Sequence, residues 1–205
     1  MIRVLLADDH PIVRDGLRRL LAADPHFEVV AEAADGDQAL ALVRANDYDV
    51  AVLDMSMPGL SGFDLVKRLK LEKPALRVLV LSMHGEQQYA ARALKAGASG
   101  YVNKDTAAEQ LLGALRKVAA GGVHVSDAAA ASLVAGAGAA PHEALSDREF
   151  EVLRLLAQGL TPTEIGERLH LSVKTVSTHK SRAQDKLGVA GTAELVRYAL
   201  ENKLL

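Results

Sequence analysis

Five polar side chains in the first half of the chain have types and spacing suited to phosphate chemistry. Each follows a short apolar run that is rich in β-branched residues and too short for a stable helix, which is typical of a strand buried on both faces. The carboxyl ends of parallel strands lie at one edge of a sheet, where open α/β folds bind ligands. We therefore expect these side chains to share one crevice: Asp8, Asp9, Asp54, Ser82 and Lys104.

Three carboxylates in one crevice repel each other unless a cation lies between them. Mg²⁺ fits this role, because it binds one or two carboxylates and keeps waters and phosphate oxygens as its other ligands. Such an ion would neutralise charge on a phosphoryl group transferred in line to Asp54, while Lys104 and Ser82 hold phosphoryl oxygens. The alternative, for each residue alone, is a turn-capping aspartate or a simple ion pair. The joint placement of all five favours the chemical site.

Alternating strand and helix patterns over residues 1–125 are expected to position these side chains. Between the strand-like runs lie helical patterns, such as the apolar series from Ile12 to Leu21, which is spaced to line one face, with Pro11 suited to the first turn. This alternation predicts an α/β flavodoxin-like, doubly wound fold with a five-stranded parallel sheet covered by helices on both faces. The expected strands are residues 4–7, 29–33, 50–53, 78–81 and 100–102.

The order of the motifs resembles the receiver domain of two-component response regulators, over about residues 1–122. The resemblance is carried by the pair Asp8-Asp9, by Asp54 with Pro58 and Gly62, and by Ser82, Tyr101 and Lys104. It implies that Asp54 accepts a phosphoryl group from a sensor histidine kinase. It also implies a Mg²⁺ ion held directly by Asp9 and Asp54, through water by Asp8, and by the backbone carbonyl of Ser56.

The resemblance further assigns Ser82 and Tyr101 to a switch. The serine hydroxyl would move toward the phosphoryl group, and the tyrosine ring would turn inward behind it. Taken alone, Tyr101 is equally typical of an ordinary half-buried strand tyrosine.

A change of composition after residues 121–122 indicates a domain boundary. Residues 127–141 contain no lysine or arginine and consist mostly of alanine and glycine, which is typical of a flexible tether. We expect a receiver domain at residues 1–122, a linker at 123–142 and a C-terminal domain at 143–205.

The C-terminal domain is expected to be all-α, because its helix starts are explicit. Residues 146–149 and 161–164 form two capping boxes, and Ser172 marks a third start. The short turn between the second and third helices is typical of a helix-turn-helix. The third helix, residues 173–187, has Val176, Ala183 and Leu187 along one side and hydroxyls and cations on the rest.

Positive charge gathers on this third helix. Residues 168–186 contain five lysines and arginines and only one acid, Asp185, although the domain as a whole is not basic. A helix of this composition is suited to the major groove of DNA, where it contacts phosphates and base edges. The alternative is the solvated face of an ordinary helical bundle.

These residues resemble the LuxR-type helix-turn-helix of NarL/FixJ-type response regulators. The resemblance is carried by residues 145–149, Glu164-Ile165, Lys174-Thr175-Val176, His179 and residues 186–188. It implies a DNA-binding transcriptional regulator controlled by phosphorylation, with a homodimer when phosphorylated, and RNA polymerase is a further candidate partner. The expected contacts to double-stranded DNA are Thr161, Lys174, Thr175, Ser177, Thr178, His179, Lys180, Ser181 and Arg182.

Two other functions stay open at this point. One is a DNA-binding regulator that ignores phosphorylation, and the other is an enzyme with an aspartyl-phosphate intermediate. The sequence offers no separate general acid or lid for an external substrate, so we expect catalysis only of the protein's own phosphoryl transfer and dephosphorylation. Cysteine is absent, and no apolar stretch reaches the length of a membrane helix, so a cytoplasmic location without membrane contact is expected.

Overall fold

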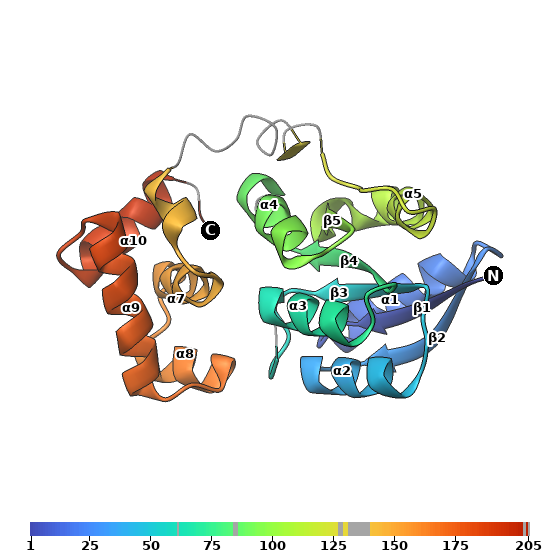
Figure 1. Cartoon of the computed structure of the whole chain (residues 1–205), viewed down its shortest axis with the longest axis horizontal. Helices are drawn as coiled ribbons and strands as arrows, with labels where there is room; N and C mark the ends of the chain where they lie inside the picture. The colour runs from blue at the N-terminus through green and yellow to red at the C-terminus, as the bar shows by residue number, and fades with distance from the viewer. Residues whose placement is uncertain (61, 84–85, 127–128, 131–139, 203, 205) are drawn as a thin grey trace. The chain divides into compact units, whose positions relative to one another are not determined.

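The computed structural model describes residues 1–60, 62–83, 86–126, 129–130, 140–202 and 204 (Figure 1). The chain forms two compact units, Met1–Ala130 and Ala131–Leu205. Within the described ranges, no helix has both the length and the apolar character needed to cross a membrane.

The N-terminal unit is built on a parallel sheet in the order β2-β1-β3-β4-β5. The parallel five-stranded sheet predicted from the sequence is therefore confirmed. Each residue of β3 is buried, as expected for a central strand covered on both faces. The strands are β1 (Ile2–Ala7), β2 (Phe27–Ala33), β3 (Val50–Asp54), β4 (Arg77–Ser82) and β5 (Gly100–Asn103).

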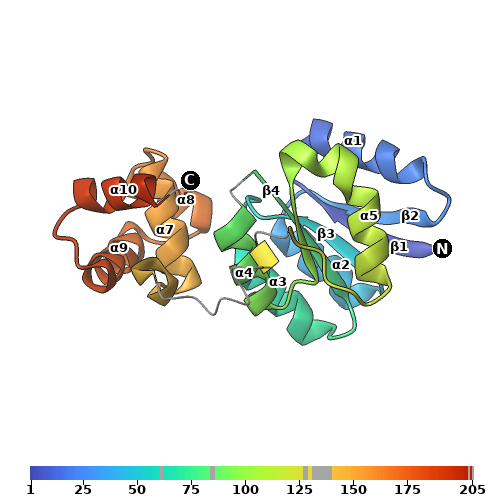
Figure 2. The ribbon, with the colours of Figure 1, turned by 90° about the horizontal axis from the view of Figure 1, so that it is seen from above.

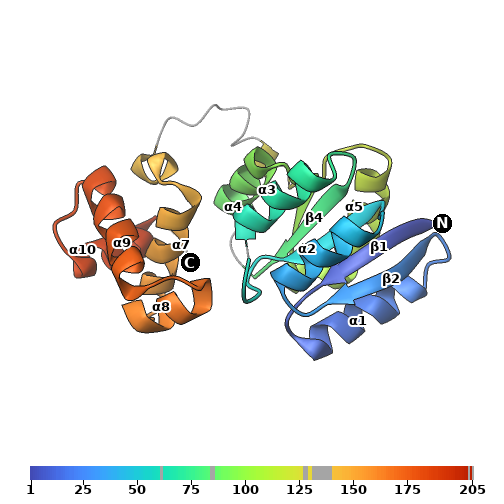
Figure 3. The same ribbon diagram turned by 60° about the horizontal axis from the view of Figure 1, so that its bottom comes forward.

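Helices cover both faces of this sheet. Helices α1 (Pro11–Ala22) and α5 (Ala107–Ala119) lie side by side on one face (Figure 2), where alternate strand residues such as Val52 and Leu81 join Leu21 and Leu115 in one core. On the other face, α2 (Gly36–Ala45), α3 (Gly62–Glu72) and α4 (Glu86–Ala96) follow one another (Figure 3). The expected inward placement of Ile12 is wrong, because this first-turn residue is 88% exposed; the buried face of α1 begins at Leu17.

The segment after α5 returns to the edge of the sheet. His124 forms a parallel bridge with Gly100, and its carbonyl accepts a hydrogen bond of 2.8 Å from the backbone N–H of Tyr101. A Cβ atom at Gly100 would lie only 2.9 Å from the carbonyl oxygen of His124, so glycine permits this close approach. The beginning of the predicted linker is thus attached to β5.

The C-terminal unit is helical, as predicted. Its described residues form a short η2 turn (Pro141–Ala144) and the helices α7 (Asp147–Ala157), α8 (Pro162–Leu169), α9 (Val173–Leu187) and α10 (Thr192–Glu201). Both predicted capping boxes are present, at Ser146 and at Thr161. The turn between α8 and α9 passes through His170 at a φ of 53°. Helix α10 begins after Gly191, an N-cap residue that has no side chain to form a capping bond.

Candidate functional site

Lys104 joins two buried carboxylates at the carboxyl edge of the sheet. Its Nζ lies 2.7 Å from Oδ2 of Asp8 and 2.8 Å from Oδ2 of Asp54. Asp8 follows β1, Asp54 ends β3, and Lys104 begins the η1 turn (Lys104–Thr106) after β5. Asp8 and Asp54 are 0% and 2% exposed. The predicted convergence of these residues from three strand ends is therefore present.

One ammonium group does not fully compensate these carboxylates. Burial raises the pKa of Asp54, and the negative charge of Asp8 adds to this; Lys104 and the backbone N–H of Ser56 act in the opposite direction. For Lys104, burial disfavours the charged form, but the hydrogen bonds and charges of Asp54 and Asp8 outweigh burial and raise its pKa. The pocket thus keeps an excess of negative charge.

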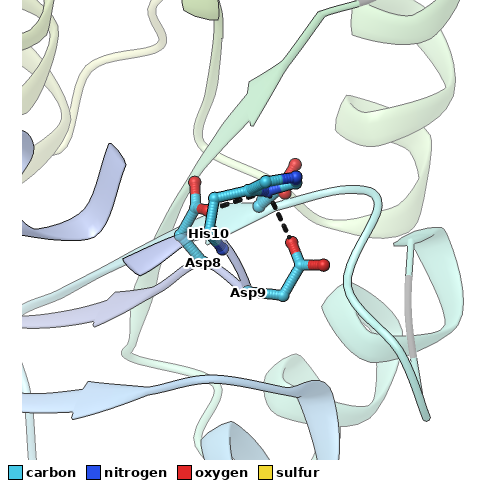
Figure 4. Close-up of side chains that lie close together, drawn as sticks. Asp8, Asp9 and His10 are labelled. Carbon is cyan, nitrogen blue, oxygen red and sulfur yellow. Dashed lines mark hydrogen bonds and ion pairs between the residues drawn. The ribbon is translucent and has the colours of Figure 1, made fainter. Parts of the chain in front are cut away.

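Asp9 and His10 extend this cluster toward solvent. Ligand atoms of Asp8, Asp9, His10 and Asp54 all lie within 4.8 Å of one another. Nδ1 of His10 is 2.9 Å from Oδ1 of Asp9 and 3.4 Å from Oδ1 of Asp8 (Figure 4). His10 was not among the residues predicted from the sequence. The sequence did contain a signal for it, because His10 directly follows Asp9 and directly precedes Pro11, where the helix starts.

The other predicted receiver residues lie near the same edge. The backbone N–H of Ser56 donates to Oδ1 of Asp54 at 3.2 Å. Asp54 pairs with Leu81 across the β3–β4 ladder, which places Ser82 one residue farther along at the end of β4. Ser82 and Tyr101 are both 0% exposed, so Tyr101 is not the half-buried tyrosine of the alternative interpretation. Their switch roles stay predictions.

A glycine that the sequence interpretation missed holds the loop after Asp54. The N–H of Gly36, the first residue of α2, donates to the carbonyl of Pro58 at 3.3 Å. A Cβ atom at this position would lie 1.5 Å from the carbonyl oxygen of Leu60, an impossible distance. Any larger residue at position 36 must displace the loop that carries Ser56.

Helix α9 presents most of the predicted DNA-contacting residues at the surface of the C-terminal unit. Lys174, Thr178, Ser181 and Arg182 are exposed, and Thr175, Ser177 and Lys180 are partly exposed. The helix starts at Val173 because the Ser172 hydroxyl accepts a hydrogen bond from the Thr175 N–H at 3.0 Å. Thr161, also exposed, caps α8 through Glu164.

Two residues of α9 make contacts within the C-terminal unit. Nδ1 of His179 is buried, and burial lowers the pKa of its imidazole. Lys186 was counted among the five cations of this region, but its Nζ lies 2.7 Å from Oε2 of the buried Glu149 and also donates to the carbonyl of Ala144. Lys186, whose side chain is 40% exposed, therefore anchors α9 to the start of α7, and its charge is balanced by Glu149.

Comparison with known proteins matches both units to described families. Residues 4–116 match the response regulator receiver domain, and residues 143–199 match the bacterial regulatory proteins of the luxR family. The chain is 34% identical to the response regulator UvrY of Escherichia coli over 209 residues, covering 100% of this chain and 96% of that protein. It is a response regulator of the NarL/FixJ type.

Further similarity to this family of response regulators extends over the whole chain. The oxygen regulatory protein NreC of Staphylococcus epidermidis is 38% identical over 216 residues, covering 100% of this chain and 99% of that protein. A structure of RcsB from Salmonella enterica serovar Typhimurium, bound to promoter rprA with the phosphomimetic BeF₃⁻, is 33% identical, with a TM-score of 0.70 over 96% of this chain and 97% of that one. The family consists of transcription regulators rather than conventional enzymes.

The acidic pocket of this response regulator has donors that fit a hard divalent cation. Three carboxylates converge there, two of them buried, against one lysine. Carboxylate oxygens in this number are typical ligands of Mg²⁺ and related ions. The receiver domain thus contains a cluster consistent with a metal site.

Proposed function

We propose that this response regulator is a transcription regulator that binds double-stranded DNA under the control of phosphorylation at Asp54, with a sensor histidine kinase as the phosphoryl donor. The observation that carries the proposal is the buried Asp54 carboxylate at the end of β3, 2.8 Å from the ammonium of Lys104 and beside Asp8. This position is at the carboxyl ends of the strands, where open α/β sheets bind their ligands.

The phosphoryl transfer follows from the arrangement of these side chains. An oxygen of Asp54 forms the new bond to phosphorus, while the bond from phosphorus to the donor histidine nitrogen breaks and that nitrogen takes up a proton. Lys104 holds a phosphoryl oxygen and balances its charge, and Ser82 donates to another. Mg²⁺, held by Asp8, Asp9, Asp54 and the Ser56 carbonyl, would neutralise part of the phosphoryl charge when bound.

Phosphorylation would then bias a switch that begins at Ser82 and Tyr101. Movement of the Ser82 hydroxyl toward the phosphoryl group would favour the inward position of the Tyr101 ring. The backbone N–H of Tyr101 bonds to the carbonyl of His124, so a shift of β5 would also reach the start of the linker. This contact supports a route from the pocket to the linker.

The C-terminal domain would use α9 to contact DNA. The exposed cations and hydroxyls of this helix suit phosphates and base edges, and the similarity to RcsB bound to promoter DNA supports the same use here. The proposed contact residues are Thr161, Lys174, Thr175, Ser177, Thr178, His179, Lys180, Ser181 and Arg182. His179 would act mainly by supporting the helix, because its Nδ1 is buried.

The proposal extends to domains and partners. We assign a receiver domain to residues 1–122, a linker to 123–142 and the DNA-binding domain to 143–205. Phosphorylation would favour a homodimer, which would place two copies of α9 in half-sites roughly one helical turn apart. The protein would act in the cytoplasm, with RNA polymerase as a further partner.

The proposal is tested with Mg²⁺ and a small-molecule phosphodonor. Wild-type protein should gain acid-stable, base-labile phosphate and shift genomic DNA fragments at lower protein concentration. Asp54→Asn should gain no phosphate, whereas Asp24→Asn, which changes a buried aspartate outside the pocket, should be labelled like wild type. Phosphate that persists in Asp54→Asn, or DNA binding that is the same with and without the donor, would contradict the proposal.

A further inference from the structure

We propose that His10 supplies an imidazole nitrogen ligand to the metal site of the receiver domain, so that ions that accept nitrogen donors gain a ligand there that adds little to the binding of Mg²⁺. The inference rests on the proposed function, because it concerns the same pocket, and it assigns a ligand beyond the carboxylates. It is based on the contact of the His10 imidazole with the carboxylates of Asp8 and Asp9.

The ring of His10 contacts two of the carboxylates. Its Nδ1 is 2.9 Å from Oδ1 of Asp9 and 3.4 Å from Oδ1 of Asp8, and Figure 4 shows a dashed line from the ring to each of these residues. Ligands of one octahedral ion with bonds of about 2.1 Å are about 3.0 Å apart when adjacent and about 4.2 Å apart when opposite. The 4.8 Å spread of the four candidate ligand atoms is close to this range.

The backbone around His10 fixes this position without using the imidazole. The backbone N–H of His10 donates to Oδ1 of Asp8 at 2.9 Å, and Pro11 provides the first residue of α1. His10 stands at the N-cap of α1, yet its side chain makes no capping hydrogen bond. The imidazole is therefore held near the pocket while it contributes nothing to the start of the helix.

The donor set decides which ions benefit from this arrangement. Mg²⁺ is bound through oxygen ligands and releases its water reluctantly, so a nearby imidazole adds little to its binding. Imidazole suits first-row ions such as Fe²⁺, Ni²⁺ and Zn²⁺, and Mn²⁺ stands at the weak-binding end of the same series. The side chain of His10 is 63% exposed, so an incoming ion can meet it before the buried carboxylates of Asp8 and Asp54. A nitrogen ligand here selects among ions that the carboxylates alone would bind similarly.

The test uses Mn²⁺ as the probe and pulsed electron paramagnetic resonance of the bound ion as the readout. Full-length wild-type protein should show coupling from a directly bound ¹⁴N nucleus. His10→Ala and His10→Gln should lose this coupling and bind Mn²⁺ about tenfold more weakly. Their affinity for Mg²⁺, measured by displacement of Mn²⁺, should change by less than about threefold, since Mg²⁺ gains little from the imidazole.

His26→Ala is the matched control. His26 is also exposed, at 74%, and its Nδ1 lies 2.8 Å from a buried aspartate, Asp24, but among the described residues it is not part of a group that could hold a metal ion. This variant should keep the nitrogen coupling and the wild-type affinity. Thermal unfolding of each variant separates loss of a ligand from loss of the fold.

The failures of the two proposals differ. Mn²⁺ that binds to wild type without nitrogen coupling, or variants that lose affinity for both ions equally, would overturn the role of His10 and leave the carboxylate site standing. Wild-type protein that binds neither Mn²⁺ nor Mg²⁺ would overturn the metal site of the proposed function together with this inference.

Discussion

In the receiver domain, Asp24 is buried at the amino ends of the strands and Asp54 is buried at their carboxyl ends. The pKa of one carboxyl group is lowered and that of the other is raised. Asp24, before β2, accepts hydrogen bonds from the backbone N–H and the ring of His26 and pairs with Arg116 of α5. These bonds, with the backbone N–H of His26 as the largest contribution, lower the pKa of Asp24 to about 2. Asp54, at the opposite edge, has a raised pKa because of its burial.

The contrast lies in compensation, because both side chains are nearly inaccessible. Asp24 has partners of its own, and the exposed guanidinium of Arg116 completes them. Asp54 shares the ammonium of Lys104 with the equally buried Asp8. A fully compensated carboxylate joins α1, β2 and α5 in a fixed structure. An incompletely compensated pair keeps a negative pocket that an added cation can complete, and this costs stability while the cation is absent.

Removal of the shared ammonium should have the largest effect on stability. Lys104→Met leaves Asp8 and Asp54 buried without a positive partner, and loss of one side of a buried ion pair typically costs about 3 kcal/mol or more of the free energy of unfolding. Saturating Mg²⁺, at about a hundred times its dissociation constant, should restore about 2.7 kcal/mol, since it binds only the folded state. Urea denaturation with EDTA and with Mg²⁺ measures both values.

Lys73→Met is the control for this experiment. Lys73 also forms a lysine–aspartate pair, at 2.6 Å, but its partner Asp47 is 83% exposed. Such surface pairs contribute at most about 1 kcal/mol, so this variant should change stability little and show no added response to Mg²⁺. If both variants lost the same free energy of unfolding, Lys104 would stabilise the pocket no more than an exposed ion pair stabilises the surface.

Neutralising each aspartate should change the melting temperature in opposite directions. Asp24→Asn removes the charge that holds Arg116 and the His26 ring, and should lower the melting temperature by several degrees. Asp54→Asn removes a buried charge that repels Asp8, leaves Lys104 to pair with Asp8, and should raise the melting temperature by a few degrees in EDTA. Calorimetry of both variants checks this, and a decrease in both would contradict the comparison.

The pH dependence of stability follows from the same two carboxyl groups. Asp24 has a pKa of about 2 in the folded protein against 3.8 in the unfolded chain, so its contribution is complete above about pH 4 and is lost as the pH falls toward 2. Asp54 has a raised pKa in the folded protein, so its ionisation costs stability as the pH rises above 3.8. Denaturation of wild type and Asp24→Asn should therefore differ at pH 5 and converge near pH 2.

Sequence patterns predicted the side chains of the pocket better than those of its surroundings. Asp8, Asp54 and Lys104 could be placed together because each follows an apolar run and parallel strands end at one edge. The full burial of Tyr101 and the bridge from Gly100 to His124 could not, because they depend on a segment folding back from more than twenty residues away. Periodicity indicates which face of an element is buried, but it does not identify the partner.

In the C-terminal domain, too, the sequence predicted local features but not the partner of a charged side chain. Capping boxes are local, so the starts of α7 and α8 were predicted correctly. Lys186 looked like part of a cationic surface, but it pairs with Glu149, thirty-seven residues earlier. The pKa of Glu149 is lowered, although burial opposes this, because Lys186 and Ser146 supply hydrogen bonds. The number of lysines and arginines along a helix does not show which of them pair with an acid elsewhere in the domain.

The smallest effect is expected for a variant that removes the His26 ring from Asp24 but keeps the backbone N–H of residue 26. His26→Ala removes the exposed ring but keeps the backbone N–H of residue 26, which makes the largest contribution to the lowered pKa of Asp24. Because ion pairs of exposed side chains contribute little, the melting temperature should stay within about 2 °C of wild type. The acid transition should also keep its midpoint, which circular dichroism between pH 2 and 5 can follow. A loss as large as that of Asp24→Asn would mean that the His26 ring, which is 74% exposed, and not the backbone, compensates this carboxylate.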